Sequence, residues 1–319
     1  LHQLKKLYVS QNKLNQLPSN LGNLLNLEVL SLNTNHLTNL PDSCAKLNKL
    51  EVLYLNDNKF KWIPNCISKG MKNLQILEFS CNINSKLDFY PLSTNLTTFY
   101  AEKNNVCLSF PKWILNSRYK KLETVSLNET RFQTLNLPKK SSISYLSELN
   151  LGYNNIFFLP EEICSLKNLS RLIINNNHLT NLPENIGELT LLEELKLRHN
   201  YLNELPESIK LLHNLKYIDL YNNEFEMAPE IIFNLPNLKG LDFEQNYFST
   251  ECLWVRISKM KSPTGSEKSF SSSSSSFDEG SHNEIFDEHW DSSEDSADEF
   301  DPHVYICNFN FNSFLNLSN

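Results

Sequence analysis

Metal-binding and catalytic side chains are sparse in this chain, and they form no known motif. His282, Glu284 and His289 are residue types that bind metal ions, but they lie in a segment with too little apolar content to fold and have no cysteine partners. None of the seven glycines belongs to a phosphate-binding loop or a dinucleotide fingerprint, and neither GxSxG nor HExxH occurs. We therefore expect no catalytic residue, no cofactor, no metal ion and no enzyme activity.

Two serines near the C-terminus have the pattern of acidic-directed kinase sites. Ser292 is followed three residues later by Asp295, and Ser296 by Glu299. Phosphorylation would add further negative charge to an already acidic segment. A solvated acidic tail without regulation explains the same residues more simply, so phosphorylation of Ser292 and Ser296 stays a second hypothesis.

A 23-residue repeat dominates the chain, and it must be interpreted before any local motif. Between Leu146 and Phe248, apolar residues recur at fixed positions with the consensus LxxLxLxxNxLxxLPxxIxxLxxL. Three regular repeats also begin the chain, whereas the spacing between residues 74 and 145 is irregular. The repeat therefore covers most of the chain, and the middle repeats depart from it.

The repeat predicts one short strand in each coil. Apolar residues alternate in xLxLx, so the leucines face the core and the residues between them face the opposite side. A single repeat cannot bury its leucines alone, so successive strands stack in parallel. The Leu-Pro step then turns the chain, and the spacing of Ile186 and Leu189 favours a short helix or turn on the convex side.

An asparagine follows the strand in nearly every repeat. Its amide donates and accepts, so it can bond backbone groups of neighbouring coils that would otherwise be buried unpaired. Thr130 replaces it in one irregular coil. The predicted structural asparagine ladder is Asn12, Asn35, Asn58, Asn82, Asn104, Asn154, Asn177, Asn200, Asn223 and Asn246.

These features resemble the intracellular 23-residue type of leucine-rich-repeat protein. That type includes Ras-pathway scaffolds, the Scribble and Erbin group, and plant Ras-group-related proteins. The resemblance covers about residues 4–248 and implies an α/β solenoid, or horseshoe, with a parallel β-sheet on the concave face and short helices or turns on the convex face. Nothing before Leu4 would cover the leucines of the first coil, so we expect the chain to be a fragment of a longer protein.

The sequence divides into four expected segments. Residues 1–248 form the solenoid of about eleven coils, irregular at 74–145, and residues 249–268 form an imperfect cap or linker. Residues 269–303 form a Ser-rich, acidic, disordered tail. Residues 304–319 form an aromatic and Asn-rich segment whose structure the sequence does not predict.

Charge and cysteine usage limit the cellular context. The chain from Ser269 onward has eleven acidic residues and no Lys or Arg, while the whole chain has a net charge of −8, so residues 1–268 carry about +3. A nearly neutral body argues against a nucleic-acid partner. The seven cysteines are scattered and form no CxxC, which indicates a reducing compartment and a cytoplasmic protein. No membrane span is visible.

The concave face carries the candidate binding residues. In the early coils, the outward strand positions include three tyrosines and several apolar residues, and in the late coils the outward positions hold a dense mixture of charges. Tyr and Arg are frequent anchors of protein interfaces, and mixed charge selects a partner by complementarity. The candidate protein-binding residues are Arg171, Glu194, Lys196, Arg198, Tyr217, Asp219, Tyr221, Asp242, Tyr8, Tyr54 and Tyr100.

Two functional hypotheses follow. The first is a protein–protein interaction scaffold or adaptor in intracellular signalling, for which the resemblance implies a small GTPase, a phosphatase subunit or a polarity protein as partner. The second is the recognition segment of a larger enzyme, such as a kinase, a phosphatase or a ubiquitin ligase, with its catalytic domain outside this chain. Sequence upstream of Leu1 distinguishes them, because further repeats and a cap favour a scaffold and a catalytic domain favours an enzyme. An extracellular receptor is disfavoured by the absence of cysteine-rich caps.

Overall fold

Strands of three residues recur in every coil and pair into a single parallel sheet. The computed structural model describes residues 3–82, 87, 89–104, 110–137 and 145–248. Within them, eleven strands pair in chain order, each with the next. The strands are β1 (Lys6–Tyr8), β2 (Val29–Ser31), β3 (Val52–Tyr54), β4 (Ile76–Glu78), β5 (Thr98–Tyr100), β6 (Thr124–Ser126), β7 (Glu148–Asn150), β8 (Arg171–Ile173), β9 (Glu194–Lys196), β10 (Tyr217–Asp219) and β11 (Gly240–Asp242).

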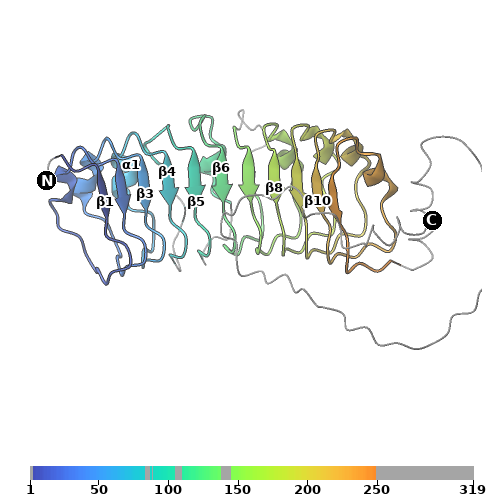
Figure 1. Cartoon of the computed structure of the whole chain (residues 1–319), viewed down its shortest axis with the longest axis horizontal. Helices are drawn as coiled ribbons and strands as arrows, with labels where there is room; N and C mark the ends of the chain where they lie inside the picture. The colour runs from blue at the N-terminus through green and yellow to red at the C-terminus, as the bar shows by residue number, and fades with distance from the viewer. Residues whose placement is uncertain (1–2, 83–86, 88, 105–109, 138–144, 249–319) are drawn as a thin grey trace, which may run out of the picture.

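Short helices form a second row that follows the sheet along the molecule (Figure 1). All but one of those described are 3₁₀ helices, because a 23-residue coil leaves room for only about one helical turn between its Leu-Pro step and the next strand. They are η1 (Leu21–Asn23), η2 (Asp42–Lys46), α1 (Asn65–Lys69), η3 (Lys112–Leu115), η4 (Glu161–Ser165), η5 (Ile186–Glu188), η6 (Glu207–Leu211) and η7 (Glu230–Asn234). The predicted leucine-rich-repeat solenoid is confirmed. The segments predicted for residues 249–319 lie outside the described residues.

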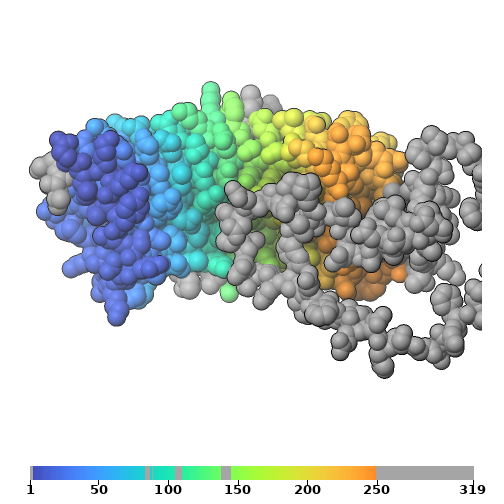
Figure 2. Space-filling view, viewed as in Figure 1, coloured from blue at the N-terminus to red at the C-terminus, as the bar shows by residue number. Residues whose placement is uncertain are grey.

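The core runs the length of the solenoid between the sheet and the helices. The middle residue of each strand points into it, and Leu30, Leu53 and Leu195 are completely buried. The flanking strand residues face outward and are mostly half-buried. Figure 2 shows the coils stacked directly on one another from the N-terminal to the C-terminal end of the described body. This stacking buries the leucines that a single repeat would expose.

Helices in neighbouring coils approach so closely that glycine is required. A Cβ on Gly22 would lie 2.0 Å from the carbonyl oxygen of Ser43, and one on Gly187 would lie 2.0 Å from that of Ser208. These distances are far below van der Waals contact, so no side chain fits without moving the backbone. The tight stacking of η1 on η2 and of η5 on η6 depends on these two residues.

Larger side chains fill the irregular middle of the solenoid. The ring of Trp113 packs edge-on against Phe89 and Phe99, with centroids 5.0 and 5.1 Å away, and against Tyr119 at 5.3 Å. The Tyr119 hydroxyl donates to the carbonyl oxygen of Pro91 at 2.9 Å. The coil between β5 and β6 is longer than the consensus repeat, so it encloses more volume, and aromatic rings occupy that volume.

The ladder asparagines each connect two coils. Asn177 Nδ2 donates to the carbonyl oxygens of Ile174 in its own coil and Leu151 in the preceding coil, and its Oδ1 accepts from the Ile156 N–H at 3.0 Å. The donor pattern, to one carbonyl in each of the two coils, recurs at Asn35, Asn58, Asn82, Asn104, Asn154, Asn200, Asn223 and Asn246.

Asn12 and Thr130 differ from the other ladder positions. Asn12 is exposed, and its amide donates to the carbonyl oxygens of Val9 and Ser10 within its own coil. Thr130 is buried, and its hydroxyl donates to the Leu127 carbonyl oxygen of its own coil at 2.7 Å. A hydroxyl has one donor where an amide has two, so it cannot bond a carbonyl in each of two coils.

The residue before each ladder position has a left-handed backbone. Its φ lies between 51° and 57° in all eleven coils, and it is never glycine. Asn176 and Asn222 tolerate this conformation, whereas the β-branched Thr34, with φ of 55°, does so at a cost. This turn directs the chain off the strand and places the next side chain, the ladder asparagine, inside the solenoid.

Candidate protein-binding surface

Outward residues of strands β8 to β11, with the residues two positions after β9 and β10, form one connected surface, which we call the late strand face. It comprises Arg171, Glu194, Lys196, Arg198, Tyr217, Asp219, Tyr221 and Asp242. The strand register aligns Arg171, Glu194 and Tyr217 in one row and Lys196, Asp219 and Asp242 in the next. The structure therefore brings together all eight late residues that the sequence singled out.

Glu194 is the centre of the first ion-pair group. Its carboxylate lies 2.6 Å from Arg171 Nε and 3.0 Å from Lys196 Nζ, and its side chain is 12% exposed. Arg171 also lies 3.6 Å from the Glu148 carboxylate on β7. Because Glu194 is largely withdrawn from water, these two cations compensate its lost hydration. Arg171 and Lys196 are thus positioned by their ion pairs with Glu194, a residue of β9.

Arg198 is the centre of the second group. Its guanidinium lies over the Tyr221 ring, 4.2 Å from the centroid, and 3.7 and 4.0 Å from the carboxylates of Asp219 and Asp242. Burial raises the pKa of Asp219 to about 6, and the backbone N–H of Tyr221 and the charge of Arg198 counteract that rise. The two Arg198 distances exceed hydrogen-bond length, so these carboxylates are only partly neutralised.

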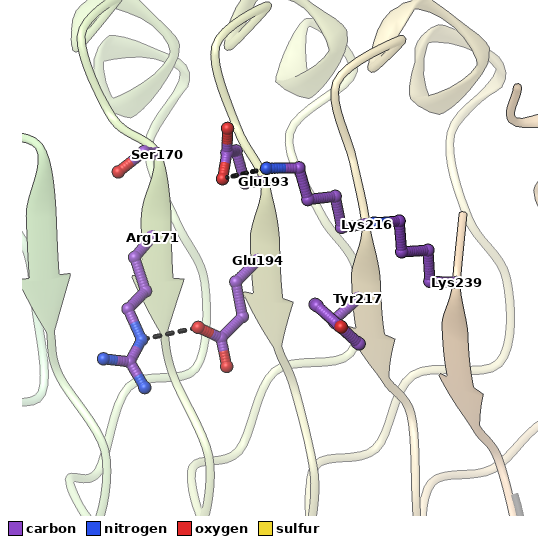
Figure 3. A pocket seen from close by; sticks show the side chains of 7 residues that line it. All are labelled: Ser170, Arg171, Glu193, Glu194, Lys216, Tyr217 and Lys239. Carbon is purple, nitrogen blue, oxygen red and sulfur yellow. Dashed lines mark hydrogen bonds and ion pairs between the residues drawn. The ribbon is translucent and has the colours of Figure 1, made fainter. Parts of the chain in front are cut away.

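A hollow of about 360 Å³ opens beside the first group. It is bounded by Arg171, Glu194 and Tyr217 of the late strand face and by residues one position before each strand, as Figure 3 shows. There the Glu193 carboxylate lies 2.7 Å from Lys216 Nζ. The hollow is lined by Ser170, Arg171, Glu193, Glu194, Lys216, Tyr217 and Lys239.

The predicted binding surface does not include Ser170, Glu193, Lys216 and Lys239. It takes in the outward strand positions and the position two residues after each strand, but not the position directly before each strand. The 23-residue spacing of these four residues was visible in the sequence. Their approach to the strand face could have been inferred by extending the aligned positions by one residue.

The structure does not bring the three early tyrosines together. Tyr8, Tyr54 and Tyr100 share one row of the sheet but lie on β1, β3 and β5, with Ser31 and Glu78 on the strands between them. Tyr8 is 63% exposed, whereas Tyr54 and Tyr100 are half-buried. They form separate contact points, unlike the connected late strand face.

A carboxylate with an altered pKa lies between two of these tyrosines. Burial raises the pKa of Glu78 to about 7, even though the backbone N–H of Ser80 donates to its carboxylate at 3.1 Å. Burial also raises the pKa of the Tyr100 hydroxyl, and nearby carboxylates add to that effect. Glu78 therefore gains charge near neutral pH, in the middle of the sheet.

Exposed aromatic rings continue beyond the strand ends in the late coils. His178 stacks on Tyr201 with centroids 5.8 Å apart, and its other neighbour is Phe157 at 5.0 Å. Phe157 is 56% exposed and Tyr201 is 46% exposed. The sequence-based prediction gives this row no role, and Tyr201 follows Arg198 by three residues in the same coil.

The described residues contain no arrangement suited to metal binding. No three His, Cys, Asp or Glu side chains are grouped there as metal ligands would be. The candidate phosphorylation sites Ser292 and Ser296 lie outside the described residues, as do His282, Glu284 and His289. None of the helices in the described ranges has the length and apolarity that a membrane crossing requires.

Buried thiols belong to the core. Cys44, Cys66 and Cys164 are free and buried, and desolvation raises the pKa of the Cys66 thiol to about 12. A thiol with so high a pKa is protonated and unreactive at neutral pH. These cysteines act as small apolar residues rather than as nucleophiles.

Comparisons with known proteins agree with this architecture. Models of the leucine-rich repeat match residues 2–60 and residues 145–166. The comparison with curated proteins finds no match. Among solved structures, a leucine-rich-repeat protein of Leptospira interrogans is 30% identical, with a TM-score of 0.63, over 81% of this chain and 70% of that one.

Two further structures are similar over three-quarters of the chain. The ectodomain of the Arabidopsis thaliana receptor kinase GASSHO1/SCHENGEN3, in complex with CASPARIAN STRIP INTEGRITY FACTOR 2, is 30% identical with a TM-score of 0.61, over 76% of this chain and 30% of that one. The leucine-rich effector YopM of Yersinia pestis is 25% identical with a TM-score of 0.56, over 76% and 61%. From the repeat, the sheet and these matches, we conclude that the chain belongs to the leucine-rich-repeat family, a general protein-interaction fold.

Proposed function

We propose that this chain is a scaffold or adaptor in intracellular signalling that binds a partner protein on the late strand face. The observation that carries the proposal is the connected surface of eight charged and aromatic residues, whose six charged members are joined by ion pairs across β7 to β11. Side chains that are already ordered lose less entropy on binding, so such a surface is preorganised.

The solved complex of the receptor-kinase ectodomain supports the proposal at the level of the fold, because a related solenoid there binds a separate factor. The resemblance to the intracellular 23-residue type implies a small GTPase, a phosphatase subunit or a polarity protein as the partner. The scattered cysteines, which form no CxxC, favour a cytoplasmic location. The charge pattern of the late strand face selects the partner, because a partner surface with complementary charges binds and one with like charges at the same positions is repelled.

The test is affinity capture from cell lysate followed by mass spectrometry. The variant changes Lys216, Tyr217 and Lys239 to alanine, which removes one tyrosine and two lysines from the late strand face and the hollow. Arg171, Lys196 and Arg198 are left unchanged, because they neutralise partly buried carboxylates and their loss would also affect folding.

The matched control changes Lys6, Tyr8 and Lys13 to alanine, the same residue types on exposed positions of the first coil. We expect a partner that is captured by the wild type and by the control but lost from the late variant. A partner retained by the late variant and lost from the control would move the binding site to the early coils.

A second candidate function is the recognition segment of a larger enzyme. The receptor-kinase ectodomain favours it, since that solenoid is named as part of a kinase. Determining the transcript on both sides of this chain tests the candidate. An adjoining catalytic domain would establish the recognition segment, whereas further repeats and a cap would establish the scaffold.

A further inference from the structure

Lys216 and Lys239 lie side by side at the rim of the hollow. The register pairs Tyr217 with Gly240, so Lys216 and Lys239 directly precede two adjacent strands, β10 and β11. Figure 3 shows both side chains extending from β10 and β11 toward β9. Two ammonium groups placed this way repel each other unless an anion lies between or beside them.

The carboxylates that line the hollow are already engaged. Glu194 is shared by Arg171 and Lys196, and Glu193 pairs with Lys216. Lys239 is exposed and forms no ion pair with any residue in the part of the chain that the structure describes. Three cations therefore line the hollow against two carboxylates, and the uncompensated charge is that of Lys239.

The walls of the hollow suit a short side chain. Tyr217 is the first residue of β10 and provides an apolar ring beside the lysines (Figure 3). Gly240, its neighbour in register, adds no side chain, so the hollow stays open toward β11. A basic group in this position would meet Lys239 with no unengaged carboxylate to receive it, whereas an acidic group would be attracted.

We infer that the hollow is a subsite for an aspartate or glutamate side chain of the partner protein, held between Lys216 and Lys239 with its stem against Tyr217. The inference rests on the proposed function and adds the charge of the group that the partner must present. The partner's carboxylate forms the ion pair with Lys239 that no carboxylate among the described residues of this chain forms.

A random peptide library selected against the full chain tests the inference. We expect the selected peptides to share an acidic residue at a fixed position. One such peptide, and its copy with that Glu or Asp changed to Lys, are then titrated by fluorescence anisotropy against the wild type, Lys239→Glu and Lys120→Glu. Lys120 is an exposed lysine in the coil between β5 and β6, so its reversal makes the same change of charge away from the hollow.

The acidic peptide should bind the Lys239→Glu variant about tenfold more weakly than it binds the wild type. The copy of the peptide that carries Lys in place of the acidic residue should bind Lys239→Glu with most of the lost affinity restored, and it should show no such gain on the wild type or on Lys120→Glu. Lys120→Glu should bind like the wild type. If the selected peptides share no acidic residue, or if they bind Lys239→Glu as tightly as the wild type, the subsite is contradicted, while the proposed function is not affected. If no peptide binds the late strand face, both fail.

One further arm identifies the occupant. In a full-length variant, the eleven carboxylates between Asp278 and Asp301 are replaced by amides. Unchanged affinity for the acidic peptide supports a partner protein as the occupant. A several-fold increase would show that the chain's own acidic segment competes for the hollow, and it would overturn the assignment to a partner.

Discussion

Replacing Asn177 with leucine should destabilise the solenoid through one specific backbone group. The Ile156 N–H donates to Asn177 Oδ1 at 3.0 Å, and both residues are buried. Leucine cannot accept that hydrogen bond, and no water reaches the group. An orphaned buried N–H costs about 1–3 kcal/mol, which sets the expected loss.

The three carbonyls that Asn177 Nδ2 bonds should contribute less to the loss. Leu151 O also receives Asn154 Nδ2 at 2.9 Å, and Ile174 O also receives Asn200 Nδ2 at 3.0 Å. Asn175 O also receives the Tyr153 N–H at 2.8 Å, so each carbonyl keeps a donor after the substitution and none becomes unsatisfied. The orphaned N–H therefore dominates the loss of stability.

Urea unfolding measures the effect, followed by circular dichroism and by tryptophan fluorescence, to which the buried Trp113 contributes. Asn12→Leu is the matched control, because Asn12 is exposed and bonds only carbonyls of its own coil. Its unfolding free energy should change by no more than about 0.5 kcal/mol. Equal effects of the two substitutions would refute the role assigned to the contact between coils.

Three further predictions concern the backbone and the titration of the sheet. Thr34→Asn should raise the free energy of unfolding by about 1 kcal/mol, because Thr34 has a left-handed φ of 55° that asparagine tolerates better, and a lower urea midpoint would contradict this. Gly187→Ala should lower it by roughly 1–3 kcal/mol, since the new Cβ would lie 2.0 Å from the Ser208 carbonyl oxygen, and an unchanged midpoint would show that η5 and η6 can separate. Stability should fall as the pH rises from 4.5 through about 7, because burial raises the pKa of Glu78 to about 7 and folding therefore favours its protonated form. Glu78→Gln should weaken this pH dependence in urea midpoints, and an identical profile would argue against it.

The strand register could be predicted from the sequence because the repeat length is nearly constant. The 23-residue spacing places Tyr8, Ser31 and Tyr54 in one outward row, and Lys196, Asp219 and Asp242 at the end of the same row. The structure pairs these residues in that order. The spacing alone fixes this alignment, since each coil repeats the same path. Whether these side chains bind a partner stays a prediction.

The sequence could not give the grouping of charges within the late strand face. Arg171 pairs with Glu194 on the next strand, whereas Arg198 lies over Tyr221 and is too far from Asp219 for a hydrogen bond. These choices depend on side-chain rotamers and on burial. The hollow likewise depends on the residues before the strands, including Lys239, and on their distance from Tyr217.

The most direct test of the central claim is photo-crosslinking to the captured partner. A benzoylphenylalanine residue replaces Tyr217 on the late strand face in one variant and Tyr8 on β1 in the other. Both positions carry an aromatic ring in the wild type, so the substitution is similar in kind. The proposed function predicts a partner crosslink from position 217 and none from position 8. A crosslink from position 8 alone, with capture intact in both variants, would contradict it.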